Sequence, residues 1–547
     1  MRALRAVLAA VVLTCAAACS DRDGVSDVAS RPNVVWIVAD DVSREIGAYG
    51  DPLARTPNVD RLAAEGTRFE NAFATSGVCA PSRAALITGM YATSIGAHHM
   101  RTLDRGYQPV PPPEVKTFTE HLRAAGYWTS NWGKLDYQFS GALDGAPISN
   151  WDEPNGDWRG RAPGQPFFAY VTILVTHESQ LFGDAGVTET DPDAVRVPPY
   201  YPDTPVVRRD FARHYDNVAR MDARVGEILA LLEEDGVADN TVVFFFPDNG
   251  RGFPRDKRTI YDGGIHEPLV VRWPGRIPAG AVDPQLVSFV DLAPTVLALA
   301  GVPVPAHMLG RVFLGPEPDP EPDYVFAAAD RHDEAHDHIR AVRDRRYKYI
   351  RNYRPDLPYG QPIRFRENLA TMREIFRLHD EGLLAPPADW YYRATKPVEE
   401  LYDTLVDPHE LENLAASPQH QDVLLRMRAA LDQWVQRTRD LGFVLEEELA
   451  ERYWPGGVQP QTPPPLVSPQ GGTFVDAVTV VLGAPVDGAS IVWTLEQGDD
   501  VHWRLYHEPI VLTTSATLRA RAVRYGWAES EEARACFVIG AAPSSCP

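Results

Sequence analysis

Cys79 stands apart in this sequence, because no other cysteine occurs between Cys19 and Cys536; it lies in the string SGVCAPSRAALITG at residues 76–89. Pro81 suits the first turn of a helix, where its missing N–H costs nothing and its φ is already helical. The segment PSRAALITG therefore predicts a helix with Cys79 at its mouth, facing free N–H groups and the positive end of the helix dipole. Arg83 follows one turn later on the same helix face.

The spacing around this cysteine disfavours the familiar thiol enzymes. A thiol phosphatase needs a longer Cys-to-Arg spacing around its phosphate loop than the offset of four positions from Cys79 to Arg83. A thiol protease needs a histidine partner in a recognisable surrounding, which the string lacks. A buried structural cysteine stays open as an interpretation at this point.

Polar residues follow three apolar runs, and their side chains are suited to bind metal or substrate. NVVWIVADD ends at Asp40 and Asp41, PFFAYVTILVTHES reaches His177, and TVVFFFPDNG ends at Asp248 and Asn249. Such runs fit strands buried on both faces of a largely parallel sheet, whose carboxyl ends gather ligands. The four oxygen-bearing residues suit a hard cation such as Ca²⁺ or Mg²⁺.

Two other interpretations apply to these strand ends. Each aspartate taken singly could be a turn or N-cap residue, although runs that also converge on His177 and Cys79 favour a shared site. A two-zinc site would need several histidine ligands, and these strand ends do not supply them.

Helical patterns between the runs complete an α/β architecture. The clearest is NVARMDARVGEILALLEEDG at 217–236, with apolar residues at helical spacing and Gly236 as a stop signal. Alternating strands and helices make roughly the first 300 residues an α/β domain, and the pattern loosens into an α+β region after it. In that region RDRRYKYIRNYR (343–354) interleaves cations with aromatics. A formal net charge of −22 disfavours nucleic acid, so we interpret the stretch as strands or as a rim for an anionic substrate.

A terminal β module follows a proline-rich linker. The linker is PGGVQPQTPPPLVSP at 455–469, and the segments TVVL, ASIVWTL and ATLRARAV beyond it predict a small β-sandwich at 470–547. SPQGGTFVDAVTVVL and TTSATLRARAVRYGWAES resemble the chitobiase-type immunoglobulin-like module attached to many secreted bacterial glycan hydrolases. We expect an accessory module without catalytic residues.

The N-terminus has the pattern of an export signal. Arg2 and Arg5 precede AVLAAVVLTCAAAC, an apolar run long enough for a secretory signal and too short to span a bilayer permanently. We expect residues 1–19 to be a signal peptide and 20–31 a linker. The expected location is therefore periplasmic, cell-surface or secreted.

Four of the five cysteines relate to this export. Cys15 would leave with the signal, and AAACS resembles a bacterial lipoprotein cleavage site that would place lipid, and thus membrane attachment, on Cys19; plain cleavage is the alternative. Cys536 and Cys546 lie close enough in an exported tail to form a disulfide. Cys79 is left without an obvious partner.

CAPSRAALITG matches the C-x-P-S-R-x-x-x-x-T-G signature of the type I sulfatases, and the chain resembles that family over about residues 32–450. Similar landmarks follow in family order: RPNVVWIVADD, TPNVDRLAAEGTRFENAF, NTVVFFFPDNG, IYDGGIHEPLVVRWPG and EELYDTLVDPHELENLA. The most similar branch includes heparan N-sulfatases and related enzymes on sulfated polysaccharides. The resemblance implies an alkaline-phosphatase-like α/β fold with a large, mostly parallel sheet, a catalytic domain at 32–304 and a smaller α+β subdomain at 305–454.

The resemblance also implies the nucleophile and the metal. In the family this cysteine is converted to formylglycine by a formylglycine-generating enzyme, and the hydrated aldehyde attacks sulfur. Family position assigns the metal to residue 79 with Asp40, Asp41, Asp248 and Asn249; Ca²⁺ is the usual ion and Mg²⁺ the alternative.

The cations around the sulfate are implied in the same way. Arg83 would hold the diol and the metal shell. Lys134 in NWGKLDY and Lys257 in PRDKRTIYDGG match two sulfate-binding lysines, and His177 matches a histidine that contacts sulfate and can protonate the leaving group. Taken singly, each could be a surface lysine or a hydrogen-bonded core histidine.

One position departs from the family. The usual pattern after the first lysine is G-K-x-H, whereas this chain has GKLD, with Asp136 in place of the histidine. We expect His98 or His99 to take over the role of that histidine. The alternative is that Asp136 itself acts as the base. A third interpretation is that both histidines are ordinary core or hydrogen-bonding residues. His266, in IYDGGIHEP, is a further candidate for substrate binding.

The sequence thus predicts a sulfatase that removes O-sulfate or N-sulfamate from saccharides of an acidic, heparan-like or algal (ulvan-like) polysaccharide. A phosphodiester or phosphonate monoester hydrolase of the same superfamily is the first alternative. A non-catalytic glycan-binding lipoprotein that uses the β module is the second, and the intact set of candidate residues argues against it.

Overall fold

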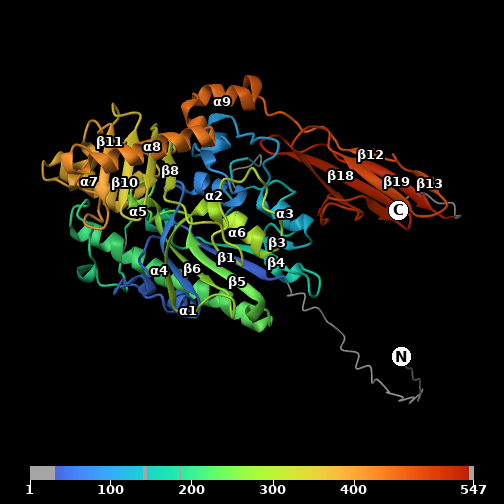
Figure 1. The fold of residues 1–547 in the computed structure, drawn as a ribbon, viewed down its shortest axis with the longest axis horizontal. Coiled ribbons are helices and arrows are strands. Elements are labelled where there is room, and N and C mark those ends of the chain that lie inside the picture. Colours follow the sequence, from blue (N-terminus) through green and yellow to red (C-terminus); the bar gives the residue numbers. More distant parts are fainter. Residues whose placement is uncertain (1–30, 140–144, 185, 541–547) are drawn as a thin grey trace, which may run out of the picture.

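The computed structural model of the chain describes residues 31–139, 145–184 and 186–540. In this part of the chain a large α/β body carries a smaller layered region and, at the far end, an elongated all-β lobe (Figure 1). The predicted signal peptide with Cys15 and Cys19, and Cys546, lie outside the described residues. No helix in the described ranges is long and apolar enough to cross a membrane.

A seven-stranded sheet forms the centre of the α/β body, with the order β3-β4-β1-β5-β6-β2-β7. Its strands are β1 (Asn33–Ala39), β2 (Thr67–Phe73), β3 (Trp128–Trp132), β4 (Phe167–Ile173), β5 (Thr241–Pro247), β6 (His266–Arg272) and β7 (Ala281–Ser288). β1 pairs in parallel with β4 and β5, and β6 alone runs antiparallel to both neighbours. The mostly parallel sheet is confirmed, with one reversed strand.

Helices cover both faces of this sheet because its central strands are apolar on both sides. The helices of this body are α1 (Pro57–Glu65), α2 (Cys79–Thr88), α3 (Phe118–Ala124), α4 (Pro205–Glu234), α5 (Asp262–Ile265) and α6 (Leu292–Leu299). Trp36 and Val38 of β1 pack with α2, α3 and α6, whereas Val35 and Ile37 pack with α1 and α4. Every residue of β1 is buried, which is why its sequence is a continuous apolar run.

The longest helix, α4, begins earlier than its apolar pattern indicates. The pattern begins at residue 217, whereas the helix starts at Pro205. The Thr204 side chain accepts a hydrogen bond from the N–H of Val207 and caps the start. The first turns pack against α7 (Ala370–Asp380), a long-range contact that the local pattern does not contain.

A four-stranded antiparallel sheet makes the smaller region, in the order β11-β10-β9-β8. Its strands are β8 (Val325–Ala329), β9 (Ile339–Arg343), β10 (Tyr347–Asn352) and β11 (Glu399–Asp403), and α8 (Gln421–Thr438) packs on one face. The basic stretch 343–354 forms the turn between β9 and β10 and the strand β10. Lys348 is fully buried there, and its Nζ donates to Asp262 of the α/β body at 2.8 Å. Part of this positive charge therefore joins the smaller region to the α/β body.

The all-β lobe consists of two sheets that share one apolar core, as predicted for a sandwich. After α9 (Glu446–Tyr453), its strands are β12 (Leu466–Ser468), β13 (Gly472–Phe474), β14 (Val478–Gly483), β15 (Ala489–Thr494), β16 (Arg504–Leu505), β17 (Ile510–Leu512), β18 (Ala516–Arg524) and β19 (Ala533–Ile539). Its likeness to an immunoglobulin-like module and the domain boundaries stay predictions.

A polar joint fixes this lobe to the α/β body. We define the joint as Lys116 and Glu120 of the body with Ser490 and Tyr525 of the lobe. Glu120 accepts hydrogen bonds from the hydroxyls of Tyr525 and Ser490, each at 2.6 Å. Lys116 Nζ donates to Ser490 Oγ at 2.8 Å. The lobe is therefore attached by buried, directional contacts.

Candidate active site

Three carboxylates meet at the ends of neighbouring strands. Asp40 and Asp41 follow β1 and Asp248 follows β5, and the parallel pairing of Ala39 with Pro247 brings these strand ends to the same level. All three side chains are buried, and one carboxylate oxygen of each lies within 4.8 Å of the others. The structure therefore brings together the oxygen ligands that the sequence places at these ends.

Cys79 begins α2 and points at these carboxylates. Its Sγ lies 3.7 Å from Asp40 Oδ1 and 4.0 Å from Asp41 Oδ1. Burial raises the pKa of the thiol to about 12, although Lys134 and Lys257 act against it. A thiol with that pKa is not a thiolate nucleophile at neutral pH, so an unmodified Cys79 is a poor catalyst. We call Asp40, Asp41, Asp248, Asn249 and Cys79 the site cluster.

Arg83 fixes the helix to the carboxylates. Its Nε donates to Asp248 Oδ2 at 2.7 Å, and its Nη1 donates to the carbonyl of Lys134 and to Thr172 Oγ1, each at 3.2 Å. The neighbouring Ser82 Oγ donates to the carbonyl of Asp248 at 2.6 Å. The guanidinium is completely buried, so its role is to hold the cluster in place.

Two lysines contact different aspartates of the cluster. Lys134 Nζ lies 3.0 Å from Asp40 Oδ2, and Lys257 Nζ lies 2.6 Å from Asp41 Oδ2. Burial lowers the pKa of each ammonium, but Asp40 and Asp41 outweigh that effect and raise both pKa values. Both lysines therefore stay charged, and they can neutralise an anion bound at residue 79.

The loop that carries Lys257 is tied to the turn before Cys79. The N–H of Arg258 donates to the carbonyl of Gly77 at 2.6 Å. A Cβ at position 77 would lie 1.9 Å from the carbonyl oxygen of Thr259. Only glycine permits this approach, which sets the position of Lys257 relative to Cys79.

His177 completes the ring around Cys79. One ring nitrogen lies within 4.8 Å of both an Asp40 oxygen and the Cys79 sulfur. Its Nδ1 accepts from the N–H of Ser179 at 3.3 Å, so in the neutral ring Nε2 carries the proton. Burial and the nearby Lys257 lower the pKa of His177.

The donor set fits a divalent metal ion. Asn249 Nδ2 donates to Asp41 Oδ1 at 2.8 Å, while its Oδ1 is buried and has no hydrogen-bond partner among the described residues. Burial, followed by the charge of Asp40, raises the pKa of Asp248 to about 7. A hard cation would satisfy the unpartnered amide oxygen and balance the adjacent carboxylates. Residue 79, the three aspartates and Asn249 could therefore hold the ion.

Glu178 and Arg258 belong to the same site, and sequence reasoning missed both. Glu178 Oε1 accepts from Arg258 at 2.7 Å and lies 3.0 Å from Lys257 Nζ. Each follows directly after a predicted site residue, and that adjacency was the available signal. Their role here is to orient Lys257.

Asp136 lies beside the cluster, whereas the two adjacent histidines face elsewhere. Asp136 Oδ2 is 3.8 Å from Lys134 Nζ, and the other oxygen of Asp136 pairs with Arg101. His99 Nδ1 accepts from the N–H of Arg331, and both ring nitrogens of His98 are buried without a hydrogen bond. No contact among the described residues joins either ring to the site cluster, so their part in catalysis stays a prediction.

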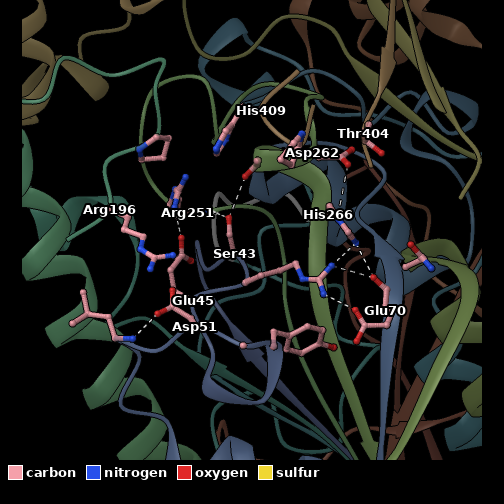
Figure 2. A pocket seen from close by; sticks show the side chains of 18 of the residues that line it. Ser43, Glu45, Asp51, Glu70, Arg196, Arg251, Asp262, His266, Thr404 and His409 are labelled. Atoms are coloured by element: carbon pink, nitrogen blue, oxygen red, sulfur yellow. Dashed lines mark hydrogen bonds and ion pairs between the residues drawn. The ribbon is translucent and has the colours of Figure 1, made fainter. Parts of the chain in front are cut away.

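His266 lies in a separate cavity of about 780 Å³ between the α/β body and the smaller region. Figure 2 shows it close to Glu70 and Asp262, across the view from Arg196. Burial, together with the nearby Arg44, lowers its pKa to about 3. No residue of the site cluster lines this cavity. The structure therefore places His266 apart from the site cluster, and its part in substrate binding stays a prediction.

Sequence comparison decides the family. Residues 32–302 match the sulfatase family, and residues 252–359 match the C-terminal region of N-sulphoglucosamine sulphohydrolase. The chain is 40% identical to an ulvan-active sulfatase of Formosa agariphila, over 92% of this chain and 90% of that relative. The chain belongs to the sulfatase family. It is an enzyme of the sulfuric ester hydrolase class.

A human relative matches a smaller part of the chain. Human N-sulphoglucosamine sulphohydrolase is 30% identical over 78% of this sulfatase and 95% of its own length. The match with the Formosa relative covers 92% of this chain, whereas residues 1–469, which precede the predicted β module, are a smaller share of its 547 residues. That match therefore extends into the β lobe.

Solved structures show the same fold. A protein in complex with its substrate D-glucosamine-2-N,6-O-disulfate aligns with a TM-score of 0.53 at 18% identity, over 75% of this chain and 98% of that one. A phosphonate monoester hydrolase of Agrobacterium radiobacter gives a TM-score of 0.55 at 19% identity, over 76% of this chain and 99% of that one. The predicted alkaline-phosphatase-like fold is confirmed.

Proposed function

We propose that this sulfatase removes sulfate from saccharides of an acidic sulfated polysaccharide of the ulvan or heparan kind. One observation carries the proposal: Cys79 is buried among three carboxylates and is flanked by two charged lysines and a histidine. The names of the ulvan-active relative and of the human N-sulphoglucosamine sulphohydrolase support the polysaccharide class.

The reaction requires more than the encoded thiol. Formylglycine made from Cys79, hydrated and next to Ca²⁺, would supply an activated hydroxyl that attacks sulfur and a second hydroxyl whose deprotonation releases sulfate. Asp40, Asp41, Asp248 and Asn249 would hold the ion. The N-terminus of α2 has no side-chain cap among the described residues, and the positive end of the helix favours anionic oxygen at residue 79.

The surrounding cations bind the sulfate and stabilise the charge that develops on it. Lys134 pairs with Asp40 and Lys257 pairs with Asp41, so both ammonium groups are fixed at the site. The proton on Nε2 of His177 is the one available for transfer, because Nδ1 accepts a hydrogen bond from the N–H of Ser179. It can donate to the leaving saccharide oxygen as the S–O bond breaks.

Export and maturation belong to the same proposal. The predicted signal peptide would carry the protein to the periplasm, the cell surface or the medium, where a polysaccharide substrate is accessible. Lipid on Cys19 would retain it at a membrane, and a formylglycine-generating enzyme of the host would convert Cys79.

Sulfate release from a glycan panel tests the proposal. Purified protein with converted residue 79 is incubated with sulfated oligosaccharides from ulvan, heparan and chondroitin, and free sulfate is measured by ion chromatography. We expect release from at least one acidic oligosaccharide and none from the Lys134→Ala variant. Absence of sulfate release from every oligosaccharide would contradict the proposal.

A second activity fits the same cations and oxygens, because a phosphodiester or phosphonate monoester also presents a tetrahedral anion. The fold shared with the Agrobacterium hydrolase makes this comparison worthwhile. Initial rates on 4-nitrophenyl sulfate and on phenyl 4-nitrophenyl phosphate discriminate the two. We expect the sulfate ester to have the higher kcat/KM.

A further inference from the structure

Two loops beside the site cluster hold three non-glycine residues in the left-handed backbone region. Arg101 and Asp136 each have a φ of 59°, and Gln138 has a φ of 67°. Such conformations are uncommon for residues with a side chain and persist where the surroundings hold them. The first two residues form an ion pair with each other, so both strained positions serve one contact.

Gln138 joins the two loops. Its Nε2 donates to the carbonyl of His99 at 2.6 Å and to that of Ala97 at 3.3 Å, and its Oε1 accepts from the N–H of Thr102 at 3.2 Å. The segment that carries Arg101 is therefore bound on both sides of that residue. This bonding fixes the direction of its side chain.

A chain of charges leads from Arg101 to the metal-binding carboxylates. Arg101 pairs with Asp136, Asp136 Oδ2 lies 3.8 Å from Lys134 Nζ, and that ammonium lies 3.0 Å from Asp40. Asp136 is fully buried, and its Oδ2 accepts no hydrogen bond from the part of the chain that the structure describes. Burial lowers the pKa of the Arg101 guanidinium, but Asp136 and Cys79 outweigh that effect and raise it. Arg101 is therefore charged and electrostatically close to residue 79.

The outer part of Arg101 is unused. Its side chain keeps 23% of its exposure, and only Nη1 forms a hydrogen bond with the described residues, to Asp136. Nε and Nη2 keep N–H groups that no described residue accepts. A guanidinium fork of this kind binds carboxylate or sulfate with two parallel hydrogen bonds.

We propose that Arg101 binds a second anionic group, a carboxylate or another sulfate, on the saccharide whose reacting sulfate lies at residue 79, and that Asp136 positions it. The inference rests on the proposed function and deepens it. It assigns to Arg101 the selection of acidic saccharides, whereas Lys134 and Lys257 bind the sulfate that is removed.

The test compares substrates that differ in the second anion. Wild type, Arg101→Lys and Arg101→Ala are assayed on 4-nitrophenyl sulfate, on a sulfated oligosaccharide with uronate, on its carboxyl-reduced counterpart and on the same oligosaccharide without the second sulfate. We expect Arg101→Ala to raise KM for the full oligosaccharide by roughly ten- to a hundred-fold with little change in kcat. KM for 4-nitrophenyl sulfate should stay unchanged.

The reduced and desulfated substrates identify the anion. The substrate that lacks the bound group should show the same KM with wild type and with Arg101→Ala. Arg101→Lys should recover part of the binding, because it keeps the charge and loses the fork. Equal KM changes on all four substrates, or no change on any, would overturn the proposal.

Two further variants separate binding from structural effects. In the double variant Arg101→Ala with Asp136→Asn, the buried carboxylate is no longer left unpaired beside Lys134. The ratio of its KM for the acidic oligosaccharide to its KM for 4-nitrophenyl sulfate should stay as high as in Arg101→Ala, whatever the change in turnover. Arg55→Ala is the matched control, because Arg55 is also partly exposed and pairs with a buried aspartate, Asp216. A wild type that cleaves 4-nitrophenyl sulfate and no oligosaccharide would refute the proposed function instead.

Discussion

Two buried polar clusters in this protein are built in opposite ways. The site cluster places oxygens of Asp40, Asp41 and Asp248 within 4.8 Å of one another, and no described residue donates to Asn249 Oδ1. The joint contains one carboxylate, Glu120, and supplies hydroxyl donors to both of its oxygens. The first cluster is incomplete without something bound, and the second is complete.

The pKa shifts divide the site cluster itself. Burial raises the pKa of Asp40, but Lys134 and Arg83 outweigh that effect and lower it overall, whereas the pKa of Asp248 moves the other way. Burial raises the pKa of Asp248 to about 7, and the nearby Asp40 adds to the rise. Burial also raises the pKa of Glu120, but Lys116 and the hydroxyl donors outweigh it and lower the pKa overall. Fully satisfied polar networks hold elements together, whereas incompletely satisfied ones indicate a ligand or catalysis. The difference separates a reactive centre from an attachment in one chain.

The largest expected effect is on the site cluster. Cys79→Ser keeps the side-chain shape and cannot yield formylglycine by the same maturation, so turnover of 4-nitrophenyl sulfate should fall by at least roughly 10³-fold. Its thermal midpoint should stay close to that of wild type, because the helix and its contacts are unchanged. Wild-type turnover in this variant would show that residue 79 is not the nucleophile.

Metal removal is expected to have the next largest effect, through the site cluster. Dialysis against a chelator should abolish sulfate release and lower the thermal midpoint, and added Ca²⁺ should restore both. Ligand linkage predicts about 2.7 kcal/mol of stabilisation at one hundred times Kd. Calorimetry with and without Ca²⁺ measures it. A protein that is equally stable and active in both states would contradict the metal assignment.

The joint should respond in stability alone. Glu120→Ala removes the acceptor for buried hydroxyls of the lobe and should lower the free energy of unfolding by about 1–3 kcal/mol. Turnover of 4-nitrophenyl sulfate should not change. Urea denaturation, with the exposed Glu114→Ala as the control, checks this. A loss of turnover equal to that of a site variant would erase the distinction between the clusters.

Local pattern explains how much of the molecule could be predicted. The apolar runs of β1, β4 and β5 predict strands, and their polar ends predict which side chains meet, because parallel strands share one edge. Pro81 likewise predicts where α2 begins. These inferences need only near neighbours in sequence.

Contacts between distant segments explain what sequence reasoning missed. The early start of α4 depends on Thr204 and on packing against α7. The partner of Asp136 is Arg101, on another loop, whereas the sequence drew attention to His98 and His99. The joint pairs residues more than 350 positions apart. No periodicity records such pairings.

The smallest expected effect is the pH dependence of the joint. The pKa of Glu120 is lowered from its ordinary 4.5, so its contribution to stability is fully present above about pH 4.5 and is lost as the pH falls through the lower folded-state pKa. The stability difference between wild type and Glu120→Gln should therefore shrink below pH 4.5. Unfolding free energies between pH 3.5 and 7 measure it. A difference that grows on acidification would have the wrong sign.

The state of residue 79 tests the central claim most directly. Preparations matured to different extents are digested, and the mass of the peptide that contains residue 79 is measured. Formylglycine is lighter than cysteine by roughly 18 Da, whereas oxidised cysteine is heavier. Sulfate release from an acidic oligosaccharide is measured on the same preparations. We expect the rate to rise in proportion to the fraction of the lighter peptide. Full activity in a preparation whose residue 79 is entirely cysteine would contradict the account.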